Sequence, residues 1–172
     1  MKLGSTVTLV YTGKLEDGTV FGVGTHEQPM VFQTGMDLVI PGLEKEIMEM
    51  EEVGEKRSFK VGMYDAYGEY LEGCTTTVPH EAMTVPAVVG KRVWLTGDNN
   101  EKVPTTVVEV TNNDITLDLN HPLAGQDLYF DVEILNIEEP PENFVSAAER
   151  KKEEERLQRM LGGGQNPDNM ML

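Results

Sequence analysis

Cysteine and histidine, the side chains that most often act as nucleophiles, bases or metal ligands, are few in this sequence. The chain has one cysteine, Cys74, and three histidines, His26, His80 and His121. No neighbouring base activates Cys74, and the scattered histidines lack the spacing of a metal site. We expect an ordinary thiol, surface or loop-bracing histidines, no resident metal and no cofactor. No Ser/His/Asp or Cys/His set for covalent catalysis is evident either.

Composition sets wide limits on the type of protein. With 39% apolar and 26% charged residues, the 172-residue chain is typical of a globular protein. Its net charge of −16 repels phosphate backbones and anionic lipid, so neither nucleic acid nor a membrane is an expected partner. No apolar run is long enough for a membrane span or a signal segment. We expect a cytoplasmic protein, and a monomer.

The first 61 residues alternate between strand and helix patterns. Residues 5–21 predict a β-hairpin that turns at Glu16-Asp17-Gly18, and residues 30–33 predict a short strand. After Pro41, the apolar residues Leu43, Ile47 and Met50 recur at helical spacing, which predicts one short amphipathic helix. Strand character returns at residues 56–61.

The middle of the chain has a different character. Between residues 75 and 119, short β-branched runs at 91–96, 105–110 and 115–119 are separated by turn residues, which predicts a small β module. A further strand follows at 127–137, with alternate apolar residues on one face. If this late strand pairs with the start of the chain, the module between them must be an insertion.

The last segment is predicted to be a charged helix followed by disorder. Ser146 and Glu149 have the spacing of a capping box, and Gly162 to Gly164 should end the helix. Only a thin apolar edge runs along it, so we expect a solvated helix rather than a coiled-coil seam. Residues 165–172 should be disordered.

Five motifs in order resemble the SlyD-like branch of FKBP-type peptidyl-prolyl isomerases. They are Tyr11 to Gly18 with Phe21, Val39 to Glu44, Gly54 to Arg57, Ala66 to Gly68, and Asn120 to Gly125. The resemblance implies an α+β fold, in which an FKBP-type antiparallel half-barrel (residues 1–69 and 126–140) wraps on the short helix. It also implies a small β-rich insert-in-flap chaperone domain at residues 70–125, followed by the charged helix and tail at 141–172.

The same resemblance implies prolyl cis–trans isomerisation without covalent catalysis. Rotation about an X-Pro bond crosses a barrier of roughly 18–20 kcal/mol, which an apolar pocket with a few hydrogen-bond donors lowers by favouring the twisted amide. The residues implied to line that pocket are Tyr11, Phe21, Phe32, Val39, Ile40, Leu43, Tyr67 and Phe130. The Tyr67 hydroxyl and the Ile40 N–H should each donate to a substrate carbonyl. The alternative is that these eight residues are simply the core of a small β domain.

One departure from the family concerns Gly22. The family commonly has an aspartate after the residue that corresponds to Phe21, at the rim of the pocket. A missing charge-assisted hydrogen bond of about 1.5–3 kcal/mol would lower the rate by one to two orders of magnitude. The resemblance therefore predicts a pocket whose catalytic rate is reduced.

The insert is implied to hold unfolded or proline-containing polypeptide chains. Candidate client-binding residues are Val78, Met83, Val85, Val88 and Trp94, because a module of this size has more apolar side chains than it can bury. Val93, Leu95, Val107 and Ile115 are more simply explained as its core. SlyD-like proteins often end in a nickel-binding tail rich in His and Cys. This tail has neither residue, so we expect no nickel-delivery role.

Two alternatives to a folding isomerase stay open. The first is a catalytically weak holdase-type chaperone that binds unfolded chains through the insert. The second is an adaptor that binds partners through residues 146–161, which the thin apolar edge of that helix disfavours. If neither activity depends on that helix, deletion of residues 145–172 should leave both intact.

Overall fold

The computed structural model describes residues 1–97 and 100–162, with side chains as far as residue 160. The chain divides into two compact units. The first comprises Met1–Lys60 together with the chain from Tyr129 onward, and the second comprises Val61–Leu128. The expected insert, residues 70–125, lies inside the second unit, while the tail at 165–172 lies outside the described residues. The α+β class predicted from the sequence is confirmed.

The first unit is built on an antiparallel sheet in the order β2-β1-β9-β4, with β3 also pairing with β1. The strands are β1 (Thr6–Lys14), β2 (Val20–Gly24), β3 (Met30–Gln33), β4 (Lys56–Val61) and β9 (Leu128–Glu138). The late strand does pair with the start of the chain, and its register places Phe130 opposite Gly13. Since β9 lies between β1 and β4, the second unit is inserted between two neighbouring strands of one sheet.

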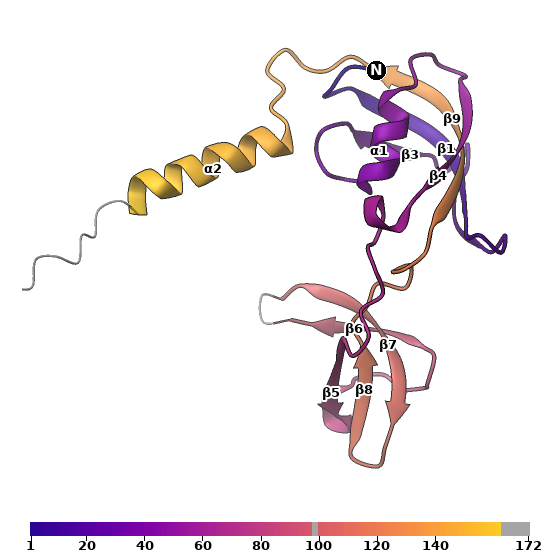
Figure 1. Ribbon diagram of the computed structural model, residues 1–172, viewed down its shortest axis with the longest axis vertical. Coiled ribbons are helices and arrows are strands. Elements are labelled where there is room, and N and C mark those ends of the chain that lie inside the picture. The colour runs from indigo at the N-terminus through magenta and orange to yellow at the C-terminus, as the bar shows by residue number, and fades with distance from the viewer. Residues whose placement is uncertain (98–99, 163–172) are drawn as a thin grey trace, which may run out of the picture. The chain divides into compact units, whose positions relative to one another are not determined.

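Helix α1 (Pro41–Met48) covers one face of this sheet (Figure 1). Pro41 suits the first helical position because its fixed φ is helical and its missing N–H is not needed there. Leu43 and Ile47 are buried toward the sheet, and Met50 is buried just beyond the helix, as the sequence spacing predicted. On the sheet side the buried residues alternate along the strands and include Val7, Leu9, Val132 and Ile134.

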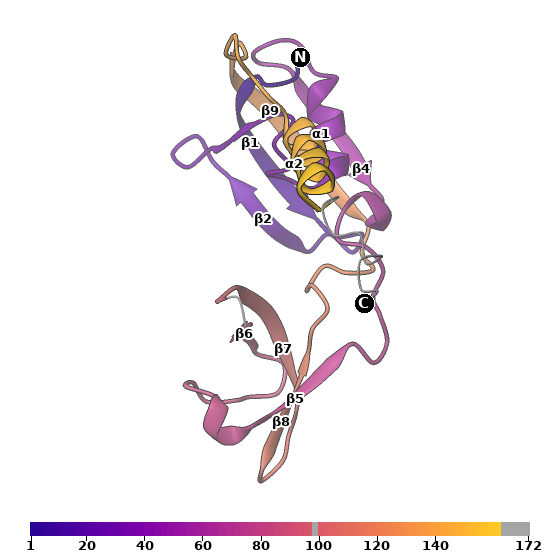
Figure 2. The same cartoon turned by 90° about the vertical axis from the view of Figure 1, so that its left-hand side faces the viewer.

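The second unit contains a separate antiparallel sheet in the order β5-β8-β7-β6 (Figure 2). Its strands are β5 (Thr75–Pro79), β6 (Arg92–Thr96), β7 (Lys102–Val110) and β8 (Asp114–Asp118), with 3-10 turns η1 (Met63–Asp65) and η2 (His80–Ala82). Three strands correspond to the three predicted runs. Strand β5 was not singled out, because Thr75-Thr76-Thr77 has no apolar alternation. The core of this unit consists of Val93, Val107, Ile115 and Leu117.

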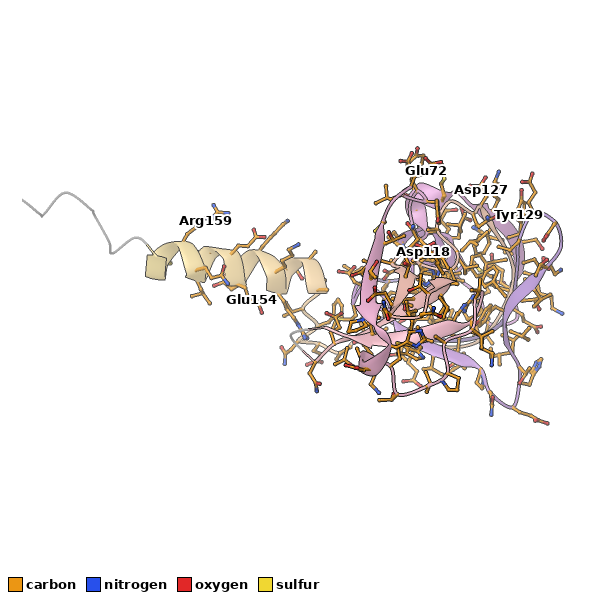
Figure 3. The ribbon with its side chains drawn as sticks, turned by 90° about the horizontal axis from the view of Figure 1, so that it is seen from below. Glu72, Asp118, Asp127, Tyr129, Glu154 and Arg159 are labelled. Atoms are coloured by element: carbon orange, nitrogen blue, oxygen red, sulfur yellow. The ribbon has the colours of Figure 1, made fainter. Side chains whose placement is uncertain are left out.

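Helix α2 (Ala147–Gly162) begins with the predicted capping box. The Glu149 N–H donates to Ser146 Oγ (3.3 Å), and the Ser146 N–H donates to Glu149 Oε2 (3.0 Å). Residues 148–160 are all exposed, and Glu154 and Arg159 project away from the helix into solvent (Figure 3). Among the described residues, no helix is both long and apolar enough to cross a bilayer.

Candidate functional site

An aromatic cluster centred on Phe130 joins four strands of the first unit. The Phe130 ring, buried on β9, lies 6.3 Å from the Tyr11 ring of β1 and 5.7 Å from the Phe21 ring of β2, which it meets edge-on. Phe59 on β4 stacks against the same ring at 5.8 Å. Edge-on and offset contacts at these distances are favourable for aromatic quadrupoles. The structure thus brings together three of the predicted pocket residues.

Two glycines give the rings of this cluster the space that they occupy. A Cβ atom on Gly13 would lie 2.5 Å from Cζ of Phe21, and one on Gly24 would lie 2.8 Å from Cδ1 of Tyr11. Real Cβ atoms do not approach carbon atoms so closely, so each ring packs over bare backbone. Neither glycine was singled out from the sequence. An isolated glycine within a strand pattern was the available signal, because it often marks a close approach to the backbone.

The other predicted pocket residues of the first unit are placed differently. Phe32 on β3 and Leu43 on α1 are almost fully buried, while Ile40 is half-buried at the N-cap of α1. The Ile40 N–H has no hydrogen-bond acceptor among residues 1–97 and 100–162, so it is available to a substrate carbonyl. Val39 lines a hollow of about 470 Å³ together with Met48.

Gly22 lies beside the hydroxyl group of Tyr11. A Cβ atom built on Gly22 would be 3.1 Å from Tyr11 Oη, and that hydroxyl makes no hydrogen bond within the described part of the chain. An aspartate at position 22 could therefore accept a hydrogen bond from the hydroxyl group of Tyr11, which has no other acceptor among the described residues. Gly22, where the family commonly has an aspartate, thus lies next to Tyr11 at the edge of the aromatic cluster.

Tyr67 belongs to the second unit, where its ring stacks on the ring of His121. The two ring centroids are 3.7 Å apart and the planes differ by 2°. Tyr67 is 39% exposed. The sequence predicted only a surface or loop-bracing role for His121 and did not indicate its contact with Tyr67. No local signal connects two residues 54 positions apart.

A charged hollow of the first unit lies beside strands β1, β4 and β9, and Tyr11 of the aromatic cluster is one of its lining residues. It measures about 460 Å³, and its walls include Lys56, Arg57, Asp131 and Glu133. Asp131 accepts hydrogen bonds from Ser58 (2.6 Å) and Lys14 (2.9 Å), which lower its pKa below the ordinary value. Such walls favour water and ions over a twisted, weakly polar amide.

The predicted client-binding residues of the second unit divide into two groups. Trp94, Val85 and Val88 are 66%, 51% and 47% exposed, so their side chains face solvent. Val78 and Met83 instead pack against the core of the unit. Further apolar residues that are at least partly exposed in this unit are Leu71, Val89, Val103, Val108 and Val110. The second unit therefore exposes several apolar side chains in addition to the predicted client-binding residues.

Comparison with known proteins gives a consistent assignment. Residues 1–135 match the family model described as FKBP-type peptidyl-prolyl cis-trans isomerase. The chain is 36% identical over 142 residues to the FKBP-type peptidyl-prolyl cis-trans isomerase SlyD of Escherichia coli K12, covering 81% of this chain and 71% of that protein. It is 34% identical over 131 residues to SlyD of Pasteurella multocida, covering 75% of this chain and 65% of that one.

Solved structures show weaker likeness. The peptidyl-prolyl cis-trans isomerase of Pseudomonas syringae matches with a TM-score of 0.44 at 20% identity, over 80% of this chain and 65% of that one. FkpA from Escherichia coli matches with a TM-score of 0.45 at 22% identity, over 81% of this chain and 43% of that one. These scores add nothing to the assignment, which rests on the sequence matches. The chain belongs to the FKBP-type peptidyl-prolyl cis-trans isomerase family and is similar to its SlyD members.

Proposed function

We propose that the chain catalyses cis–trans isomerisation of X-Pro bonds in unfolded or partly folded polypeptides. The observation that carries this proposal is the aromatic cluster of Tyr11, Phe21 and Phe130, with the unpaired Ile40 N–H in the same unit. Apolar rings desolvate the proline and favour the twisted amide, whose resonance is reduced. A fixed backbone donor holds the flanking carbonyl without forming a covalent bond.

In this proposal, the second unit binds the polypeptide. Its exposed residues Trp94, Val85 and Val88 offer apolar contact to segments that a folded client would bury. Because both units belong to one chain, a captured client has a raised local concentration at the isomerase site. The partners are thus unfolded chains, and the proposal involves neither nucleic acid nor a membrane.

Proline-limited refolding of a model protein tests the catalytic proposal. Catalytic amounts of the chain should accelerate the slow phase, and Phe130→Ala should lose most of that effect because the cluster loses its central ring. Trp94→Ser is the matched control on a short proline peptide, since that side chain lies on the second unit. An unchanged slow phase with excess protein would reject catalysis.

The holdase alternative is favoured by one observation, the glycine at position 22. If catalysis is weak without a carboxylate there, binding by the second unit is the remaining activity. Light scattering by an aggregating client should then fall in the presence of the chain, even when isomerisation is undetectable. Trp94→Ser should weaken this protection, while Phe130→Ala should leave it largely unchanged.

A further inference from the structure

The segment that joins β9 to α2 packs against residues near the start of the first unit. We call its contact part, residues 144–147, the strap. The Phe144 ring covers Gly4 and Gly35 so closely that a Cβ atom on these glycines would lie 2.5 Å and 3.4 Å, respectively, from a ring carbon. The Ala147 N–H donates a hydrogen bond to the Gly35 carbonyl (2.8 Å). The strap therefore holds Gly35 both by packing and by a hydrogen bond.

Gly35 lies in the loop that leads from β3 to the N-cap of α1. Its N–H donates to the carboxylate of Glu44, in the first turn of that helix. Further along the loop, Asp37 has a φ of +54°, which costs a non-glycine residue energy that its surroundings must offset. Residues 37–39 make no backbone hydrogen bond within the described part of the chain. The shape of the loop therefore depends on the contacts at its ends, and those of Gly35 hold one end.

The Ile40 N–H belongs to the peptide group between this loop and helix α1. On the helix side, the Glu44 N–H donates to the Ile40 carbonyl (3.1 Å), as expected for the N-cap residue. On the loop side, the carboxylate of the same Glu44 accepts the Gly35 N–H. Glu44 thus ties the two ends of the loop together, so the direction of the Ile40 N–H depends on the helix and on Gly35.

We propose that the strap is a positioning element for catalysis: it fixes Gly35, and through the loop it fixes the direction of the Ile40 N–H that donates to the substrate carbonyl. A donor that is oriented before the substrate arrives holds the backbone beside the twisted amide without reorganisation. All of these contacts lie within the first unit. This inference rests on the proposed isomerase function and on the role of Ile40 in it.

A proline at position 147 breaks the strap's hydrogen bond and retains helix α2. Ala147 is the first residue of that helix, where proline is favoured because the N–H there has no partner inside the helix. Ala147→Pro removes the donor to Gly35, and the proline ring occupies the space of that hydrogen bond. We expect kcat/KM for a short proline peptide to fall on the order of 10-fold, with kcat more affected than KM. Glu154→Pro, in the exposed part of the same helix, is the matched control and should leave kcat/KM unchanged.

A double-mutant cycle with Ile40→Pro, which removes the donor itself, gives the decisive comparison. The φ of Ile40 is −59°, which a proline ring adopts, and its N–H has no acceptor among residues 1–97 and 100–162, so no internal hydrogen bond is lost. If the strap acts through this N–H, Ala147→Pro should cost little further activity in the Ile40→Pro background. An equal loss in both backgrounds would overturn the inference, because the strap would then support the fold generally.

NMR signals of the backbone amides distinguish failure of this inference from failure of the proposed function. The Ile40 amide signal should move in Ala147→Pro and stay in place in Glu154→Pro, while the signal of Val132 in β9 should stay in place in both. A parent that does not accelerate isomerisation would reject the proposed function, while the moved Ile40 signal would still support its positioning by the strap. An Ile40 signal that is unchanged in Ala147→Pro would overturn the inference whatever the activity.

Discussion

At the scale of single residues, the Phe21-Gly22 pair decides how much catalysis the aromatic cluster provides. We predict that Gly22→Asp raises kcat/KM for a proline peptide. The Cβ atom of the new side chain would lie 3.1 Å from Tyr11 Oη, so its carboxylate could gain that hydroxyl as a donor. A charge-assisted hydrogen bond of about 1.5–3 kcal/mol corresponds to an increase of about 10-fold or more if it acts fully in the transition state.

The matched control for this change is Val23→Asp. Val23 is the next residue of β2 and is 55% exposed, so the same charge is added on the opposite face of the strand. Isomerase assays on both variants should show a gain for Gly22→Asp alone. A similar gain in both would point to a general electrostatic effect rather than to a rim carboxylate.

A second prediction at this scale concerns the glycine beneath Phe21. Gly13→Ala should lower both stability and activity, because its Cβ would meet the Phe21 ring at 2.5 Å and force the ring away from Phe130. Overpacking of this kind costs about 1–3 kcal/mol. Urea unfolding together with peptide turnover measures both effects.

Gly62→Ala is the control for the glycine experiment. The nearest atom to a Cβ at Gly62 lies 4.0 Å away, and its φ of −66° suits any residue. Alanine there should be neutral or slightly stabilising, since it restricts the unfolded chain. Equal destabilisation by both substitutions would contradict the role that we assign to the space at Gly13.

At the scale of elements, periodicity predicted most of the fold. The α1 helix, the first hairpin and the late strand β9 each carry apolar residues at the spacing of their own secondary structure, and each is confirmed. Strand β5 lacked that signal, because Thr75-Thr76-Thr77 pairs with β8 through its backbone rather than through an apolar face. The stacking of Tyr67 on His121 is a tertiary contact that sequence spacing could not indicate.

Asp118, at the end of β8, is expected to make the second unit sensitive to acid. Burial alone raises the pKa of this carboxyl, but hydrogen bonds from the Asn120 N–H (2.9 Å), the Tyr70 hydroxyl (2.8 Å) and the Asn120 side chain (2.8 Å) lower it below 3.8. Because the folded state disfavours the proton, this carboxylate stabilises the fold above pH 3.8. That stability is lost as the pH falls toward the lower pKa of the folded state.

Fluorescence of Trp94, the chain's only tryptophan, measures this effect because Trp94 lies in the same sheet. Urea midpoints followed by this signal should fall below about pH 4 in the parent, and the fall should be smaller in Asp118→Asn. Asp114→Asn, at the exposed opposite end of β8, is the control and should follow the parent. If both variants show the parent's slope, Asp118 is not the group responsible.

At the scale of the whole molecule, the insertion and the C-terminal helix are two additions to one sheet that differ in how they are attached. The second unit joins β4 to β9, two neighbouring strands, so its ends are fixed by the sheet. Within the described residues, helix α2 is attached at its start, where Ser146 is buried and the Ala147 N–H donates to the Gly35 carbonyl (2.8 Å). The structure therefore divides the terminal segment into an anchored part and an exposed part.

This division predicts different results from two truncations. Removing residues 150–172 should leave activity within about 2-fold and stability nearly unchanged, because residues 150–160 are exposed and their ion pairs, such as Arg156–Glu153, are surface pairs. Removing residues 142–172 also deletes Phe144, whose ring packs over Gly4 and Gly35, and should lower the free energy of unfolding by about 3 kcal/mol or more.

Isomerase and anti-aggregation assays on the shorter truncation test the adaptor alternative as well. If either activity is lost in that truncation, the exposed part of helix α2 takes part in function.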